Sequence, residues 1–72
     1  MAANDNHVYK TIEITGTSAK SMENAVETAV ARAGKTLKNL RWFEVSQVRG
    51  NIEKGKIHHW QVSVKIGFLL NG

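Results

Sequence analysis

Apolar and polar residues alternate in three segments of the chain, residues 8–15, 40–52 and 56–70. Because successive side chains of a β-strand point to opposite faces, this alternation predicts three half-buried strands. The third segment has the longest apolar face, made of Trp60, Val62, Val64, Ile66, Phe68 and Leu70. We expect this face to lie over a helix.

The second segment carries an aromatic residue on each face. Phe43 and Val45 share the parity that should meet a core, whereas Trp42 has polar neighbours on the opposite face. Beyond Val45 the apolar residues change from odd to even positions, as Val48 shows. A β-bulge near Ser46–Gln47 would realign the two halves of the strand.

A helix is predicted between the first two strands. Its apolar positions recur at helical spacing: Met22, Ala25, Val26, Ala29, Val30 and Ala33. Ser18 or Ser21 can cap its first turn, and Gly34 suits the residue that follows a helix. The small side chains of the stripe favour close packing on a sheet over binding to a membrane surface.

The order β-α-β-β predicts an α+β fold, in which a three-stranded antiparallel sheet wraps over one helix. Residues 53–55, Glu-Lys-Gly, should form the turn between the last two strands. We expect residues 1–72 to form a single domain, with residues 1–6 disordered.

Composition narrows the function. Ten Lys and Arg against six Asp and Glu give a net charge of +4, but the basic residues are spread over the chain, which is typical of a solvated surface. With 72 residues and no cysteine, oligomerisation is the expected source of extra stability. The N-terminal sequence lacks the pattern of a signal peptide and no apolar run is long enough for a membrane span, so we expect a cytoplasmic protein.

The sequence contains no recognisable catalytic motif: it has no nucleophile motif, no paired carboxylates and no glycine-rich phosphate loop. His58 and His59 are adjacent, so they should point to opposite faces of a strand and not chelate one metal together. One of them could join His7. We predict no metal site.

Trp42 and Gln61 are the candidate binding residues, because parity places both on the sheet face away from the helix. Neighbouring antiparallel strands can bring such side chains within reach, directly or diagonally. An exposed indole and a carboxamide suit a planar heteroaromatic ring with a hydrogen-bonding edge. The alternative is that Trp42 is buried in a subunit contact.

Six segments of the chain match the sequence pattern of a known family: His7–Ser18, Ser21–Ala25, Arg32–Leu37, Arg41–Val45, Arg49–Gly50 and Trp60–Val62. The match covers about residues 7–68, and its most specific parts are the RWFEV strand and the WQV strand nineteen residues further on. In these segments the chain closely resembles the dodecins, which are small flavin-binding proteins that assemble into hollow dodecamers.

This resemblance implies a non-enzymatic homododecamer that stores or sequesters a flavin, either FMN (a nucleotide) or riboflavin. By position, Trp42 matches the tryptophan that stacks on the isoalloxazine ring, Gln61 the glutamine that binds its polar edge, and Arg49 a basic residue of the ligand region. Some relatives also bind coenzyme A, but Leu69 stands where a basic residue is expected. The alternatives are a basic nucleic-acid-binding module, with Trp42 as a stacking platform, and an oligomeric scaffold without a flavin.

Overall fold

A computed structural model describes residues 6–70 of the chain. Its elements are β1 (Tyr9–Ser18), α1 (Met22–Thr36), β2 (Leu40–Glu53) and β3 (Lys56–Leu69). This confirms the predicted α+β fold with β-α-β-β order. The disorder expected of residues 1–6 falls, apart from Asn6, outside the described residues. Within the described part of the chain, no helix is long and apolar enough to cross a membrane.

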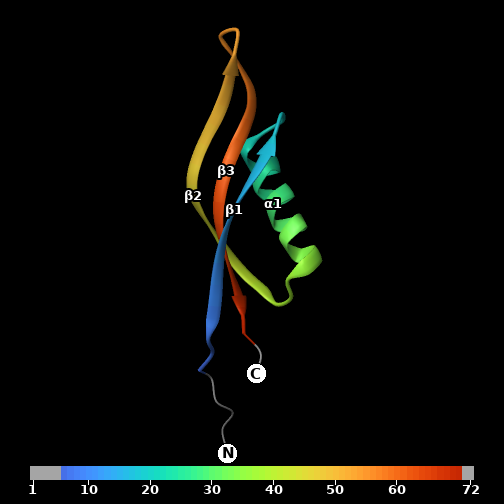
Figure 1. The fold of residues 1–72 in the computed structure, drawn as a ribbon, viewed down its shortest axis with the longest axis vertical. Coiled ribbons are helices and arrows are strands. Elements are labelled where there is room, and N and C mark those ends of the chain that lie inside the picture. The colour runs from blue at the N-terminus through green and yellow to red at the C-terminus, as the bar shows by residue number, and fades with distance from the viewer. Residues whose placement is uncertain (1–5, 71–72) are drawn as a thin grey trace, which may run out of the picture.

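The sheet has the strand order β1-β3-β2, and both pairings are antiparallel. The last strand is therefore the central one. Figure 1 shows that the β2–β3 hairpin extends well beyond β1 and α1. Its turn is formed by Lys54 and Gly55, whose φ angles of 53° and 76° fit the two-residue hairpin turn that needs positive φ at both positions. The predicted turn is thus confirmed.

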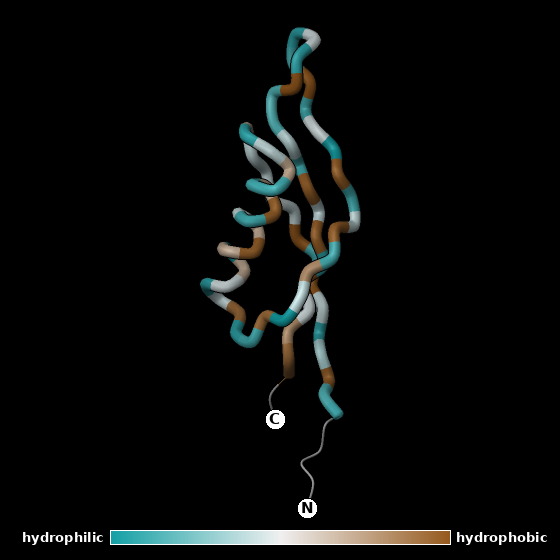
Figure 2. Tube along the Cα trace, turned by 180° about the vertical axis from the view of Figure 1, so that it is seen from behind, coloured by the Kyte–Doolittle hydropathy of each residue, from teal (hydrophilic) through white to brown (hydrophobic). Residues whose placement is uncertain are grey.

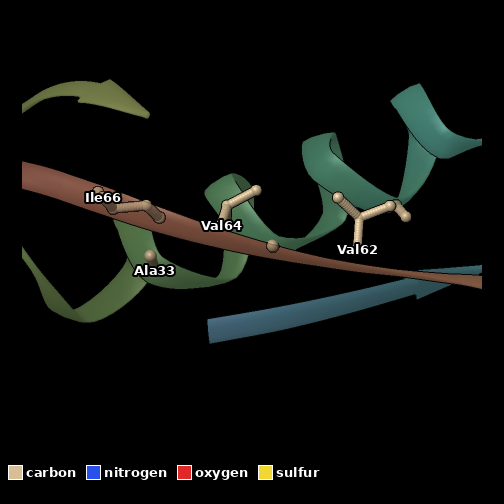
Figure 3. Close-up of a cluster of buried hydrophobic side chains, with 6 residues drawn as sticks. Ala33, Val62, Val64 and Ile66 are labelled. Carbon is tan, nitrogen blue, oxygen red and sulfur yellow. The ribbon is translucent and has the colours of Figure 1, made fainter. Parts of the chain in front are cut away.

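The core lies between α1 and the middle of β3. Its helix side consists of Ala25, Ala29 and Ala33, and its sheet side of Val62, Val64 and Ile66. Figure 3 shows the three branched side chains in a row along β3, with Ala33 on the adjacent helix. The helix can approach closely because its buried residues are all alanine. Gly16 of β1 meets it, where an added Cβ would lie only 2.9 Å from Ala29 Cβ.

One side of β2 is not covered as the sequence pattern predicted. Phe43 and Val45 were expected to meet a core, yet Phe43 is 52% and Val45 43% exposed. The reason is the strand order, because α1 packs on β1 and β3 and leaves the outer strand bare. Figure 2 shows apolar segments recurring between polar ones along the hairpin.

The ends of α1 refine the predicted boundaries. Ser21 is the N-cap, and its side chain accepts a hydrogen bond from the Asn24 backbone N–H at 3.0 Å. Gly34 does not terminate the helix, contrary to expectation. The last turn continues to Thr36, and the Leu37 N–H still donates to the Ala33 carbonyl, which a glycine inside the helix permits.

The predicted bulge is present in β2, where Ser46 is the extra residue between the pairs Val45–Val64 and Gln47–Ser63. Its hydroxyl donates to the Glu13 carboxylate, with Oγ and Oε2 2.6 Å apart. Two further register shifts, at residues 40–42 and 51–52, were not predicted. They affect the two ends of the hairpin.

Candidate functional site

The three residues singled out in the sequence lie on one face of the sheet, the face away from α1. Trp42 of β2 pairs with Gly67 of β3, and Arg49 pairs with Gln61. These β3 positions have the opposite parity to buried Val62. The face predicted for Trp42 and Gln61 is therefore correct, and Arg49, for which no face was predicted, lies on it as well.

Trp42 lies over bare backbone. A Cβ built on Gly67 would overlap three atoms of the six-membered indole ring, so the ring occupies the space of a missing side chain. The Tyr9 ring packs edge-on against the indole, with centroids 5.0 Å apart at an interplanar angle of 68°. The indole nevertheless remains 43% exposed. It forms a supported aromatic platform that is open to a ligand.

Arg49 is the centre of a polar cluster at the other end of this face. Its Nε donates to Gln61 Oε1 at 2.9 Å, and its Nη1 donates to Gln47 Oε1 at 3.0 Å. The hydroxyl of Ser63 lies 3.3 Å from Nη1 and 2.8 Å from the Thr15 hydroxyl. The guanidinium thereby orients the Gln61 amide, with Oε1 toward Arg49.

The charge of Arg49 is not balanced nearby. Among residues 6–70, no carboxylate lies within 4.0 Å of its guanidinium, and all of its contacts are with neutral oxygens. A guanidinium with free donors can bind a carboxylate or a phosphate in a planar, two-pronged fashion. This end of the face therefore suits an anionic group.

The structure does not bring Trp42 and Gln61 of one protomer together, although neighbouring strands were expected to do so. Their β3 positions, Gly67 and Gln61, are six residues apart. At about 3.3 Å per residue, the two sites are separated by roughly 20 Å. The register, which follows from the turn and the bulges, sets this separation.

Two of the histidines also lie differently from the prediction. His58 and His59 were expected on opposite faces, yet their Nδ1 atoms are only 2.9 Å apart. The register shift between Asn51 and Ile52 leaves His58 without a partner in β2, which interrupts the alternation of side chains. His7 contacts Tyr9, far from the hairpin turn, so it cannot join them within a protomer.

A hollow on the helix side of the sheet is larger than the small cavity lined by Trp42. It measures about 700 Å³, against about 170 Å³ for the small cavity beside Trp42. Its lining is mostly apolar and comes from α1, β2 and β3: Met22, Glu23, Val26, Glu27, Val30, Ala31, Phe43, Val45, Val48 and Val62. This groove is the uncovered side of β2, and its side chains suit packing against another apolar surface.

Sequence reasoning did not identify the residues that support the site. Gly67 had a signal, because a glycine inside a strand often marks a close approach of another group. Tyr9 shares the parity of the polar face, but its contact with Trp42 crosses the central strand. The link between Gln61 and His59, whose Nε2 atoms are 3.2 Å apart, follows only from the structure.

Known proteins resemble this chain in sequence. The family model described as Dodecin matches residues 8–71. The dodecin of Thermus thermophilus is 46% identical over 63 residues, which cover 88% of this chain and 91% of the relative.

Solved structures show the same fold at similar identity. The dodecin from Streptomyces coelicolor superimposes with a TM-score of 0.91 at 51% identity, covering 96% of this chain and 99% of the other. The dodecin from Streptomyces davaonensis gives a TM-score of 0.89 at 46% identity, with coverage of 94% and 100%. The sequence match, the β-α-β-β topology and these superpositions lead to one conclusion: the chain belongs to the dodecin family.

Proposed function

We propose that this protein binds a flavin without catalysis, and that it stores or sequesters FMN or riboflavin in the cytoplasm as a hollow homododecamer. The observation that carries the proposal is the half-exposed Trp42 indole, held flat over Gly67 and braced by Tyr9. An aromatic platform of this kind suits a planar heteroaromatic ring. Family membership supports the same ligand class.

The proposed ligand lies between protomers. Trp42 and Gln61 of one chain are roughly 20 Å apart along the sheet, which is well beyond the length of a three-ring isoalloxazine. A flavin stacked on Trp42 of one protomer therefore takes its polar-edge hydrogen bonds from Gln61 of another. In this arrangement the site is complete only in the assembled protein.

Arg49 gives a reason to place FMN ahead of riboflavin. Within the described residues, its guanidinium donates only to neutral oxygens, so it can also bind the phosphate of FMN, a group that riboflavin lacks. Coenzyme A is a secondary ligand in this proposal. Leu69 supplies no cation at the position where a basic residue was expected, which weakens the case for a second anionic ligand.

The test compares the two tryptophans. Stacking on an aromatic side chain is worth about 1–3 kcal/mol per nucleobase, and a flavin ring is larger than a base. Trp42→Ala should therefore weaken flavin binding at least tenfold, which corresponds to about 1.4 kcal/mol. The residual bound flavin should regain fluorescence, because a stacked indole can quench it by donating an electron to the excited ring. Flavin titrations followed by fluorescence measure both effects.

Trp60→Ala is the matched control. Trp60 has the parity of buried Val62 and pairs with Ser18 and Gly50, so it belongs to the opposite face. Its loss should lower thermal stability and leave the flavin affinity near that of the parent. Parent-like flavin binding by Trp42→Ala would contradict the proposal.

A further inference from the structure

A row of polar side chains runs from Arg49 through Gln61 toward the tip of the β2–β3 hairpin. Arg49 Nε donates to Gln61 Oε1 at 2.9 Å, and Gln61 Nε2 lies 3.2 Å from His59 Nε2. The Nδ1 atoms of His59 and His58 are 2.9 Å apart, so the two rings share one hydrogen bond. Nε2 of His58 lies 3.7 Å from Glu53 Oε1. The proposed flavin site uses the first two of these residues and assigns no role to the other three.

The guanidinium at one end sets the donors and acceptors along the row, because it has no acceptor atom. Gln61 turns its oxygen to Arg49 and its amide nitrogen, which only donates, to His59. Nε2 of His59 therefore accepts and carries no proton, so the proton of the neutral imidazole is on Nδ1. That proton is donated to Nδ1 of His58, whose own proton is then on Nε2, the nitrogen nearest Glu53.

We infer that His59 is a positioning residue of the binding site, which in its neutral form holds the Gln61 amide as the ligand meets it. The inference rests on the proposed function, in which Gln61 binds the polar edge of a flavin. The amide has two lone pairs on Oε1 and two hydrogens on Nε2. Arg49 takes one lone pair and His59 one hydrogen, so one acceptor and one donor remain side by side. This pair fits a ring edge that offers an N–H next to a carbonyl group.

Two anchors hold the amide more firmly than Arg49 alone. Arg49 is exposed, and it bonds only the oxygen of the amide. His59 is half-buried and bonds the nitrogen. With both ends held, Gln61 is already oriented before a ligand arrives, and a group that is oriented in advance loses less entropy on binding.

A second proton on the histidine pair reverses the contact with Gln61. If His59 takes the proton, its Nε2 becomes a donor and faces the donor nitrogen of the amide. If His58 takes it, Nδ1 of His58 becomes a donor, and the proton of His59 must move to Nε2 with the same result. Turning the amide over would bring its nitrogen against the Arg49 N–H. Acidification therefore loosens the amide.

The charged groups near the pair come from β2, one at each end of the row. Glu53 contacts His58, and Arg49 reaches His59 only through Gln61. β1 ends one pair short of this position, and α1 packs on the other face of the sheet. Because histidine changes charge between about pH 5 and 8, the two imidazoles are the groups of this row that respond in that range.

The test measures the affinity of the assembled protein for riboflavin, which lacks a phosphate that would itself titrate in this range. His59→Ala should weaken binding roughly three- to tenfold, as expected for the loss of one hydrogen-bond partner. His59→Gln should restore most of the affinity, because its carboxamide oxygen can accept the same N–H. In a Gln61→Ala background, His59→Ala should have no further effect, because it acts through the amide.

A pH series and a structure with visible protons add independent measurements. The parent should bind riboflavin roughly three- to tenfold more weakly at about pH 5 than at about pH 8, and His59→Gln should remove most of this difference. His7→Ala is the matched control and should retain the difference. Neutron diffraction of the flavin-free protein at neutral pH should show protons on Nδ1 of His59 and on Nε2 of His58.

Parent-like affinity of His59→Ala would overturn the inference. So would an equal loss in the Gln61→Ala background, affinity of the parent that does not change with pH, or a proton on Nε2 of His59 at neutral pH. A parent protein that binds no flavin would contradict the proposed function instead. The proton positions in the flavin-free protein would then still show whether His59 holds the amide.

Discussion

At the scale of single residues, the contact between Trp42 and Gly67 determines what the polar face can bind. The indole occupies the volume that the Cβ of any residue other than glycine at position 67 would fill. Tyr9 packs against its edge from β1, so the platform draws on all three strands. The orientation of the indole therefore depends on a residue that itself has no side chain.

We expect Gly67→Ala to weaken flavin binding at least tenfold, because the new methyl group would overlap the indole and displace it. Tryptophan emission should shift in the flavin-free protein, which reports the displacement directly. Gly34→Ala is the matched control. Its Cβ would meet only Leu40 Cδ1 at an ordinary 3.8 Å, and replacing a helical glycine should stabilise the fold by about 0.4–1 kcal/mol. Unchanged flavin affinity and emission in Gly67→Ala would contradict this account of the platform.

Sequence parity could place Trp42 and Gln61 on one face, but it could not give their separation. The distance along the sheet depends on strand register, which the hairpin turn and the bulges determine together. The bulge beside Ser46 could be predicted, because the apolar positions of the sequence change parity there. The register shift beside His58 left no such signal in the sequence, because the residues around it are polar or exposed on both faces. The expectation for the two histidines was wrong for that reason.

At the scale of elements, the start of α1 depends on two serines with different tasks. Ser18 ends β1, and its hydroxyl accepts from the Lys20 and Ser21 N–H groups while donating to Asn24 Oδ1. Ser21 caps the helix itself. The sequence predicted a cap at one of these positions but could not choose, since both are serines at suitable spacing from the apolar stripe.

Ser21→Ala should lower the free energy of unfolding by about 1 kcal/mol, the usual effect of removing an N-cap side chain. Ser21→Asp should restore most of the loss, because a carboxylate accepts the same N–H bond and interacts favourably with the positive end of the helix dipole. Chemical denaturation at fixed protein concentration compares the three proteins. Equal stability of the alanine variant and the parent would show that Ser18 alone suffices to start the helix.

At the scale of the whole molecule, a lone protomer leaves too much apolar surface in water. Phe43, Val45 and Val48 are 52%, 43% and 48% exposed on the side of β2 that α1 does not reach. Burying a large apolar side chain contributes roughly 1.5–3 kcal/mol, so a second apolar surface over this groove would stabilise the fold appreciably. The protomer is elongated, 63 Å in its longest dimension, and its one described helix packs on β1 and β3, so it does not cover this side of β2 itself.

We therefore expect the protein to sediment at micromolar concentration as one large oligomer, with twelve subunits as the proposed number. Val45→Glu should dissociate it, because assembly would bury an unpaired charge in the groove. Val45→Ile keeps the apolar character and should assemble. A parent protein that sediments as an 8.0 kDa monomer would rule out the assembly.

The position of β3 in the sheet has a consequence for how the chain folds during synthesis. Among the described residues, β3 is made after β1 and β2, yet both of these strands pair with β3 and not with each other. Until it emerges, α1 can rest on β1, but neither strand has a hydrogen-bonding neighbour. The pairing that then forms joins residues as distant as Tyr9 and Leu69, and such long-range closure is slow. Formation of the sheet is thus postponed until β3 has been made, and subunits can assemble only after that.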